Sequence, residues 1–385
     1  ERRKWIDEAS YLHALNFCML LPGPEAQQLA TYVGWRLHGV RGGIVAGALF
    51  VAPGAVVMAA LAWIYVVYGS TSLLSALFFG VKAAVVAFVA EAIFKIGKRA
   101  LKRRADVAVA ATSFLALAVL GAPFPLVILA ALLAGYLNAP PASAATDAPS
   151  TKAASTWRVA LVWIAVWLAP LAASFALLGP DHVVTRVGVL FAGLALVTFG
   201  GAYAVLAWLA DVAVRSEHWL TAAQMADGLG LAETTPGPLV LVNQFVGFLA
   251  GWSEGGIVVA LLAAAMASWQ TFAPSFVWIF AGAPYADAFR RNPRIESALR
   301  MVTAAVLGVV AALAFWFAVH VLFTRTAPLA TPWGRVIDLP ALASFDPAAA
   351  AIALAAAFAL IRLKLNPLAV VAAAAAAGAA ARLLA

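Results

Sequence analysis

The chain has 385 residues, of which 65% are hydrophobic and only 11% are charged. An average soluble domain has about 25% charged residues and roughly 45–50% apolar ones. This composition therefore excludes a water-soluble enzyme. Low charge excludes a disordered chain, and the single cysteine, Cys18, excludes a disulfide scaffold. The class that remains is an all-α polytopic membrane protein.

Positive charge exceeds negative charge, with 25 Lys and Arg against 17 Asp and Glu and a net charge of +8. In a membrane protein this excess is typical of cytoplasmic loops that face anionic lipid. No basic patch is interleaved with aromatic residues on a soluble module, so no nucleic-acid partner is expected. The lipid bilayer is the expected large-scale partner.

Apolar stretches that could cross a bilayer follow one another along the chain. A spanning helix needs roughly 20 mostly apolar residues. The clear candidates are 43–69, 72–97, 157–178, 185–210, 256–282, 295–323, 347–363 and 367–384, with shorter stretches at 105–120 and 123–137. The segment 139–156 is rich in Pro, Ala, Ser and Thr, which predicts a linker outside the bilayer.

Two more apolar stretches, 11–37 and 220–250, are each interrupted in the middle by the same three residues. The interruptions are Pro22-Gly23-Pro24 and Pro236-Gly237-Pro238. Proline lacks an amide hydrogen and suits the first turn of a helix, while glycine lets the backbone turn. Each stretch is therefore predicted to be a broken helix, either spanning or re-entrant.

The interrupted stretches indicate a tandem repeat. The two Pro-Gly-Pro motifs lie 214 positions apart, as do Trp5 and Trp219. Further matches pair Gly42-Gly43 with Gly255-Gly256, Pro53 with Pro274, and Lys82–Val85 with Thr303–Val306. The predicted organisation is a first repeat at 1–138, the linker at 139–156, a connecting transmembrane helix at 157–184 and a second repeat at 185–385. Phe199-Gly200-Gly201 has its counterpart before residue 1, so we expect a preceding helix that this sequence lacks.

The positions of Lys and Arg predict the orientation of the repeats. Cytoplasmic loops collect these residues near helix ends. Basic residues follow the second span of the first repeat at Lys98–Arg104, and they follow the first span of the second repeat at Arg290–Arg294. The two repeats are therefore predicted to be inverted relative to each other, with both basic loops in the cytoplasm.

Inverted repeats with helices broken at matching places are typical of secondary transporters with a site near the middle of the membrane. A half-helix that begins at Pro24 or Pro238 presents free N–H groups and the positive end of its dipole, which favours an anion. Two such ends could face one dianion between them. The alternative interpretation is a pair of proline kinks that serve packing alone.

Polar residues flank both interruptions. Amides and hydroxyls can donate hydrogen bonds to an oxyanion without burying a fixed charge, although interhelical hydrogen bonding is an equal alternative. The candidates for substrate binding are Gln27, Gln28, Thr234, Thr235, Asn243 and Gln244. The candidates for proton coupling are Glu25, Asp227 and Glu233.

Lys82 lies ten residues into the predicted span 72–97, where a charged residue is costly and is functional by default. A bound dianion would supply its counter-charge; the alternative is an ion pair with Glu91 or a neutral lysine. Glu91 and Lys95 are spaced for a structural pair within one helix. His320, close to a helix end, is expected to have an interfacial role.

No spacing of His, Cys, Asp or Glu predicts a metal site, and no nucleotide-binding or hydrolase motif is found, so no metal or cofactor is expected. Transport would then be driven by an ion or passive. A membrane-embedded enzyme is the alternative from another class, and it would need clustered catalytic side chains at one depth.

In these motifs the chain resembles the chromate ion transporter family of the long, two-domain type. The resemblance rests on residues 1–43, on Phe50–Gly54, on the segment around Lys82, on Phe199–Leu206 and on Met225–Phe248. It implies a multi-pass protein of a prokaryotic inner membrane that exports chromate, with sulfate as the structural analogue. It carries over to Pro22, Gly23, Pro24, Gln28, Lys82, Gly200, Gly201, Pro236, Gly237, Pro238, Asn243 and Gln244.

The expected function is therefore secondary transport of chromate or sulfate by alternating access, giving chromate resistance and using H+ as a candidate coupling ion. A sulfate-type uptake carrier and an anion channel are the alternatives. The oligomeric state is left open between a monomer and a homodimer.

Overall fold

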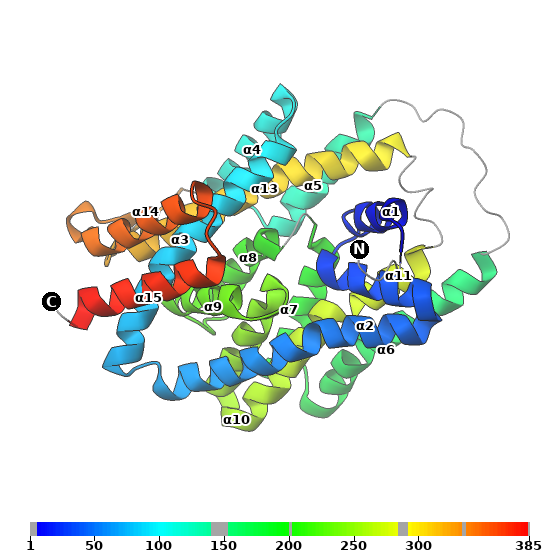
Figure 1. The fold of residues 1–385 in the computed structure, drawn as a ribbon, viewed down its shortest axis with the longest axis horizontal. Coiled ribbons are helices and arrows are strands. Elements are labelled where there is room, and N and C mark those ends of the chain that lie inside the picture. Colours follow the sequence, from blue (N-terminus) through cyan, green and yellow to red (C-terminus); the bar gives the residue numbers. More distant parts are fainter. Residues whose placement is uncertain (1–5, 140–152, 200–201, 284–291, 333–335, 384–385) are drawn as a thin grey trace. The chain divides into compact units, whose positions relative to one another are not determined.

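The computed structural model describes residues 6–139, 153–199, 202–283, 292–332 and 336–383 (Figure 1). Its helices in chain order are α1 (Glu8–Cys18), α2 (Glu25–Tyr68), α3 (Ser72–Ala100), α4 (Arg104–Leu115), η1 (Ala116–Leu120), α5 (Phe124–Leu137), α6 (Ala153–Leu178), α7 (Val183–Val197), α8 (Ala202–Ala210), η2 (Asp211–Ser216), α9 (Ala222–Thr234), η3 (Leu239–Leu241), α10 (Val242–Phe272), α11 (Pro274–Gly282), α13 (Pro293–Leu322), η5 (Leu342–Ser344), α14 (Pro347–Ile361) and α15 (Pro367–Leu383). The strands of the described residues, β1 (Thr326–Ala330) and β2 (Val336–Pro340), form one antiparallel hairpin.

Five helical stretches of the described residues are long and apolar enough to cross a membrane. They are Glu25–Tyr68, Ser72–Ala100, Thr156–Leu178, Leu239–Gly282 and Pro293–Leu322. Together with the near absence of sheet, they confirm the prediction of an all-α polytopic membrane protein.

The chain forms two compact units, and each unit takes segments from both halves of the sequence. Unit 1 comprises 1–59, 130–205 and 236–302, and unit 2 comprises 60–129, 206–235 and 303–385. These units follow packing and not chain order, so the predicted division at 1–138, 139–156, 157–184 and 185–385 stays a prediction.

Unit 1 is built around α10, which packs against α6 and α7, while α11 packs against α6. Aromatic residues fill the space beside α11, where the Trp163 ring stacks on Phe276 at 5.4 Å between centroids. Phe17 of α1 belongs to the same buried cluster as Ile279 and Phe280 of α11. This packing places the first Pro-Gly-Pro turn, which follows α1, within unit 1.

Unit 2 has α3 at its centre, with α9, α14 and α15 packed around it. The backbone of Gly80 in α3 lies directly against Ala374 of α15, and Gly378, one turn further along α15, also packs against Gly80. Small residues let membrane helices approach this closely, since their packing depends on van der Waals contact. Phe78, Val81 and Phe88 line the core on the α3 side.

Two helical stretches of unit 1 reverse direction at a glycine. Gly39 within α2 has φ of +65° and Gly256 within α10 has φ of +68°, and the residue before each is also non-helical. Gly34 consequently packs on Gly42, and Gly251 packs on Val259. The sequence paired Gly42-Gly43 with Gly255-Gly256, whereas the residues with matching backbone are Gly39 and Gly256. Only the left-handed conformation requires glycine at this point, and the sequence pairing stays a prediction.

The predicted span 185–210 is divided in the structure. Helix α7 ends at Val197 and α8 begins at Ala202, with Thr198 in a non-helical conformation. The Thr198 carbonyl accepts a hydrogen bond from the Gly23 N–H at 2.8 Å, so the first Pro-Gly-Pro turn satisfies this helix end. Gly200 and Gly201 lie outside the described residues.

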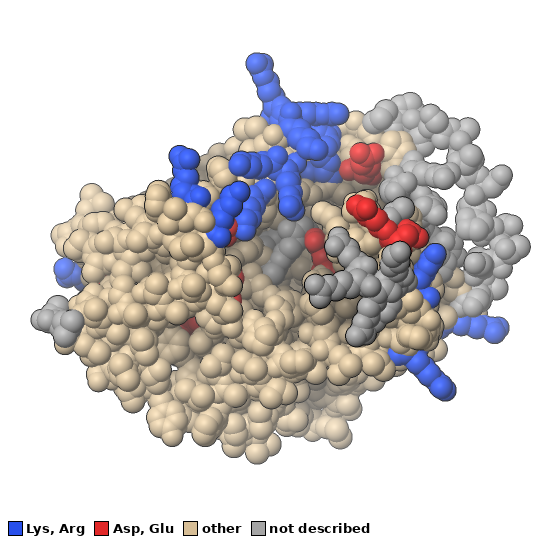
Figure 2. Space-filling model, in the orientation of Figure 1, with Lys and Arg blue, Asp and Glu red and all other residues tan. Residues whose placement is uncertain are grey.

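Basic side chains gather where α3 passes into α4, as Figure 2 shows. Lys95, Lys98, Arg99, Lys102, Arg103 and Arg104 are all exposed there. The cluster includes the loop Lys98–Arg104, whose cytoplasmic location stays a prediction. Of the second predicted loop, Arg290 and Arg291 lie outside the described residues.

Candidate functional site

The first Pro-Gly-Pro turn is a tight, buried reversal. Gly23 has φ of +119°, a conformation that favours glycine, and α2 begins at Glu25, directly after Pro24. The Gln28 side chain closes the turn, because its Nε2 donates to the Pro22 carbonyl at 2.7 Å. The start of α2 is therefore held in place by its own first turn.

The second Pro-Gly-Pro turn has the same backbone form, with φ of +130° at Gly237. Here the 3₁₀ turn η3 separates Pro238 from α10. The Pro236 carbonyl oxygen lies so close to Gly54 that no side chain could be accommodated at position 54. Both turns belong to unit 1.

Two glutamines make reciprocal hydrogen bonds across unit 1. Gln27 Nε2 donates to the Phe272 carbonyl at 3.4 Å, and Gln244 Nε2 donates to the Ala55 carbonyl at 2.8 Å. Gln27 and Gln244 are 217 positions apart, as are Ala55 and Phe272 and the kink residues Gly39 and Gly256. Each half of the chain therefore donates one glutamine hydrogen bond to a backbone carbonyl of the other half.

The amide groups around the turns are buried, and their oxygens have no hydrogen-bond partner in the part of the chain that the structure describes. This holds for the side-chain oxygens of Gln27, Gln28, Asn243 and Gln244. Their nitrogens donate to protein acceptors, as Asn243 Nδ2 does to Thr271 Oγ1 at 3.0 Å. An amide nitrogen carries two hydrogens, so each side chain keeps one donor and its oxygen for a ligand or water.

The other flanking residues have local contacts. The hydroxyls of Thr234 and Thr235 both donate to the Leu231 carbonyl at 2.8 Å, within the last turn of α9. Glu25 lies in the first turn of α2, where the helix dipole favours a negative charge. Glu233 is half-buried near the end of α9.

Lys82 has a protein counter-ion within unit 2. Its Nζ lies 3.8 Å from Asp227 Oδ1, and the Tyr65 hydroxyl donates to Asp227 Oδ2 at 2.9 Å. The Asp227 side chain is 5% exposed and the Lys82 side chain is 25% exposed. The contact between Lys82 and Asp227 is longer than a hydrogen bond, so the charges attract each other without sharing a proton.

Small and aromatic residues position this ion pair. Gly230, three residues after Asp227 and hence on the same side of α9, lies directly against Val81 of α3. The close approach brings the Asp227 carboxylate to Lys82, which neighbours Val81. Tyr65 is held edge-on against Phe78, with centroids 5.0 Å apart.

Sequence reasoning identified Lys82 and Asp227 separately but did not join them. The alternative partner that it considered for Lys82, Glu91, instead pairs with Lys95 at 2.7 Å, as the spacing within the helix predicted. Tyr65 was missed altogether, because a tyrosine inside an apolar span resembles any other core aromatic residue. The pairing could have been predicted because ionisable residues of opposite charge within apolar stretches tend to pair with each other.

No metal centre is found among the described residues, since no three His, Cys, Asp or Glu side chains come together to hold an ion. The polar residues described above fall into two groups, one in each unit. The turns and their amides lie in unit 1, whereas Lys82, Asp227 and Tyr65 lie in unit 2.

Comparison with known proteins shows which family the chain matches. A family model described as chromate transporter matches residues 1–136 and 185–379. The chromate transport protein of Cupriavidus metallidurans is 30% identical, over 80% of this chain and 73% of that protein. The chromate transport protein of Pseudomonas aeruginosa is 31% identical over 81% and 72%, and the probable chromate transport protein of Synechococcus elongatus is 28% identical over 81% and 75%. No solved structure matches the chain.

Proposed function

Because this chain belongs to the chromate transporter family, we propose that it is a secondary transporter that exports chromate across the plasma membrane of a prokaryote. The family and the names of the relatives indicate a transporter and not an enzyme. Sulfate, another tetrahedral dianion, is the proposed second substrate. Alternating access is the proposed mode of transport.

The ion pair between Lys82 and Asp227 carries this proposal. Lys82 lies ten residues after the start of α3, about 15 Å along the helix axis at 1.5 Å per residue. That depth is near the middle of a hydrocarbon core about 30 Å thick. Ionisable residues at such a depth pair with each other and mark ion pathways. Asp227 here occupies the place that an anionic substrate would take beside the ammonium.

The mechanism follows from competition for Lys82. A tetrahedral dianion that reaches the Lys82 ammonium displaces the Asp227 carboxylate, whose contact with Lys82 at 3.8 Å has no hydrogen bond to lose. Asp227 keeps the hydrogen bond from Tyr65 and can take up a proton in the apolar interior, where a lone carboxylate is unfavourable. Substrate binding and proton binding would then be linked through one carboxylate.

We assign a second role to the turns of unit 1. Pro22-Gly23-Pro24 is followed directly by α2, and Pro236-Gly237-Pro238 is followed by η3 and then α10. The first N–H groups of a helix favour an anion. The free donors of Gln27, Gln28, Asn243 and Gln244 would supply further hydrogen bonds. Thr234, Thr235, Gly200 and Gly201 stay candidates for substrate binding. Glu25 and Glu233 stay candidates for proton coupling. The matching kinks and the reciprocal glutamines support an inverted repeat.

Flux measurements in proteoliposomes test the role of Lys82. We expect Lys82→Met to abolish chromate and sulfate flux, because the Lys82 ammonium supplies the positive charge that attracts the dianion in this proposal. Lys95→Met is the matched control, since Lys95 lies on the same helix, pairs with Glu91 and is 66% exposed. Surface pairs of this kind contribute about 0–1 kcal/mol, so Lys95→Met should transport normally.

Asp227 provides the second arm of this test. We expect Asp227→Asn to transport without responding to an imposed pH gradient. Removing one partner of a buried ion pair lowers the free energy of unfolding by about 3–5 kcal/mol, because the other charge is left buried and unpaired. Removing both partners leaves no unpaired charge. The double variant should therefore unfold at a higher temperature than Lys82→Met and still show no flux. Flux restored in the double variant would give the pair a purely structural role.

The same vesicles separate the alternatives. An exchanger shows counterflow, in which unlabelled anion on one side drives uptake of labelled anion from the other. A channel shows none, and an uptake carrier concentrates anion in the opposite direction.

A further inference from the structure

Basic side chains gather in unit 2 where α3 ends and α4 begins, and none of them belongs to the proposed substrate site (Figure 2). They are all exposed and comprise Lys98, Arg99, Lys102, Arg103 and Arg104. Helix α3 ends at Ala100, and Leu101 leaves the helical conformation with ψ of 82° before α4 begins at Arg104. The charges therefore come from two helix ends that meet at one corner, and we call them the corner cluster.

The acidic residues nearest to the corner cluster in the sequence have other contacts. Glu91 pairs with Lys95 at 2.7 Å. The Asp106 carboxylate accepts hydrogen bonds from the backbone N–H groups of Lys102 and Arg103, so it caps the start of α4. Within the part of the chain that the structure describes, no ion pair joins a side chain of the corner cluster to a carboxylate. Positive charges so close together repel one another, so an anion from outside the chain is favourable here.

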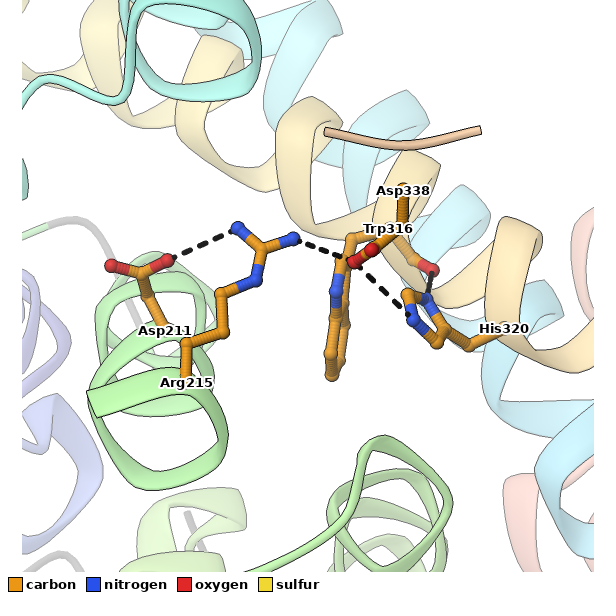
Figure 3. Close-up of polar contacts among 5 residues, drawn as sticks. All are labelled: Asp211, Arg215, Trp316, His320 and Asp338. Atoms are coloured by element: carbon orange, nitrogen blue, oxygen red, sulfur yellow. Dashed lines mark hydrogen bonds and ion pairs between the residues drawn. The ribbon is translucent and has the colours of Figure 1, made fainter. Parts of the chain in front are cut away.

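Arg215, also in unit 2, shows the opposite arrangement (Figure 3). Its guanidinium contacts Asp211 at 3.3 Å and Asp338 at 3.0 Å. Asp338 in turn lies 3.6 Å from His320 Nε2. Arg215 is thus paired within the chain, whereas the corner cluster keeps its donors for a partner outside it.

Helix stability explains only part of the corner cluster. A helix dipole favours positive charge near its C-terminus and negative charge near its N-terminus. Lys98 and Arg99 in the last turn of α3 agree with this preference. Arg103 and Arg104 oppose it, because they occupy the N-cap and the first position of α4. Residues that break a local preference are expected at functional sites, which makes these two arginines candidates for binding.

The length of α3 places the corner cluster at the membrane surface. Helix α3 has 29 residues and is apolar enough to cross a membrane. At 1.5 Å per residue it is about 43 Å long, which matches the thickness of a bilayer with its headgroups, about 40–45 Å. The two ends of α3 therefore fall in the two headgroup layers, and the corner cluster lies level with the lipid phosphates.

Apolar side chains lie beside these charges. Phe94 is 49% exposed, and the Lys98 ammonium lies over its ring, 4.2 Å from the centroid. Leu101 is 38% exposed. Aromatic rings and the long stems of lysine and arginine are favoured where the acyl region meets the headgroups. An acidic protein would match the charges alone, whereas a lipid also matches Phe94 and Leu101.

We propose that the corner cluster binds the phosphate of an anionic phospholipid, with Phe94 and Leu101 against its acyl chains. The planar guanidinium groups of Arg99, Arg103 and Arg104 suit bidentate hydrogen bonds to phosphate oxygens, while the two lysines act as point charges. The phosphate also supplies the negative charge that the start of α4 favours. The folded protein is therefore stabilised by an anionic lipid at this corner.

Thermal unfolding of the full chain in a neutral detergent tests this proposal. The additions are phosphatidylglycerol, phosphatidylcholine with the same acyl chains, and inorganic phosphate. We expect only phosphatidylglycerol to raise the unfolding temperature, because a ligand that binds the folded protein alone stabilises it. The increase should shrink at high salt, which screens exposed charges. An equal increase with phosphatidylcholine or inorganic phosphate, or none with phosphatidylglycerol, would overturn the proposal.

Neutral variants of the corner cluster show whether the lipid binds there. The triple variant Arg99→Gln, Lys102→Gln, Arg103→Gln removes three of its charges. Each basic residue near an anionic lipid strengthens binding about fivefold, so this variant should need about 100-fold more phosphatidylglycerol for the same increase in unfolding temperature. Arg99→Gln alone should need about fivefold more, and it serves as the test if the triple variant does not fold.

The matched control removes the same number of exposed basic residues elsewhere in unit 2: Arg325→Gln, Arg362→Gln, Lys364→Gln. Each increase is measured from the variant's own unfolding temperature without lipid, so that a change in stability is not mistaken for a change in binding. The control should respond to phosphatidylglycerol as the parent protein does. An equal loss of response in both triple variants, or a full response in the variants of the corner cluster, would contradict the assignment.

Discussion

The two Pro-Gly-Pro turns have the same sequence and nearly the same glycine φ, +119° and +130°, but different surroundings. Gly23 is buried, and a Cβ there would lie 2.8 Å from Gln28 Nε2. Gly237 is exposed, and a Cβ there would lie 3.0 Å from a methyl group of Leu241. The motif determines the backbone conformation of the turn, whereas the neighbouring residues determine how large a side chain fits at its glycine.

The residues that face the turns differ in the same way. Gly54 lies against the carbonyl of Pro236 in the second turn, and Ser275 lies 3.5 Å from the Cβ position of Gly23 in the first. Gly54 and Ser275 are 221 positions apart, like Pro53 and Pro274. The residue after the proline is thus a glycine where backbone approaches backbone, and a serine where a side chain fits.

The largest difference between the halves is expected for Gly54→Ser. A new Cβ would collide with the Pro236 carbonyl, which is backbone and cannot rotate away, at a cost of about 3 kcal/mol. Ser275→Gly is the reverse exchange at the residue after Pro274 and should cost less than about 1 kcal/mol. Thermal unfolding in detergent measures both. Equal losses in the two variants would show that the turns have equivalent surroundings.

An intermediate difference is expected between Gly23→Ala and Gly237→Ala. Both place a side chain at positive φ, which costs about 1–3 kcal/mol. Gly23→Ala should lose about 1 kcal/mol more, because the Gln28 amide must leave the Pro22 carbonyl. The two unfolding temperatures, together with chromate flux, measure this difference. A greater loss for Gly237→Ala would contradict the comparison.

The smallest difference is expected between the reciprocal glutamines. Gln244→Leu removes a hydrogen bond of 2.8 Å and Gln27→Leu removes one of 3.4 Å. Hydrogen bonds between membrane helices contribute about 0.6 kcal/mol on average and up to about 1.7. Gln244→Leu should therefore lower stability more than Gln27→Leu, and both should reduce flux. Full flux in either variant would remove that amide from the proposed site.

Much of the fold could be predicted from the sequence because it depends on local preferences. Low charge and long apolar stretches predict membrane helices, and proline beside glycine predicts where a helix is interrupted. Lys82 could be identified from its depth in an apolar stretch alone. The division of the predicted span 185–210 could not be predicted from the sequence. It depends on the Gly23 N–H, which comes from a distant segment and donates to the Thr198 carbonyl.

The sequence by itself determined the membrane class, the two Pro-Gly-Pro turns, the family and the isolated charges Lys82 and Asp227. Only the tertiary structure decided that these charges meet, with Tyr65 beside them, and that His320 faces Asp338. The physical reason is that residue type sets the local backbone and the cost of burial, whereas partners depend on which helix faces approach. In unit 2 that approach depends on small residues such as Gly230, which lies against Val81. The contact cannot be predicted from the spacing of these residues in the sequence.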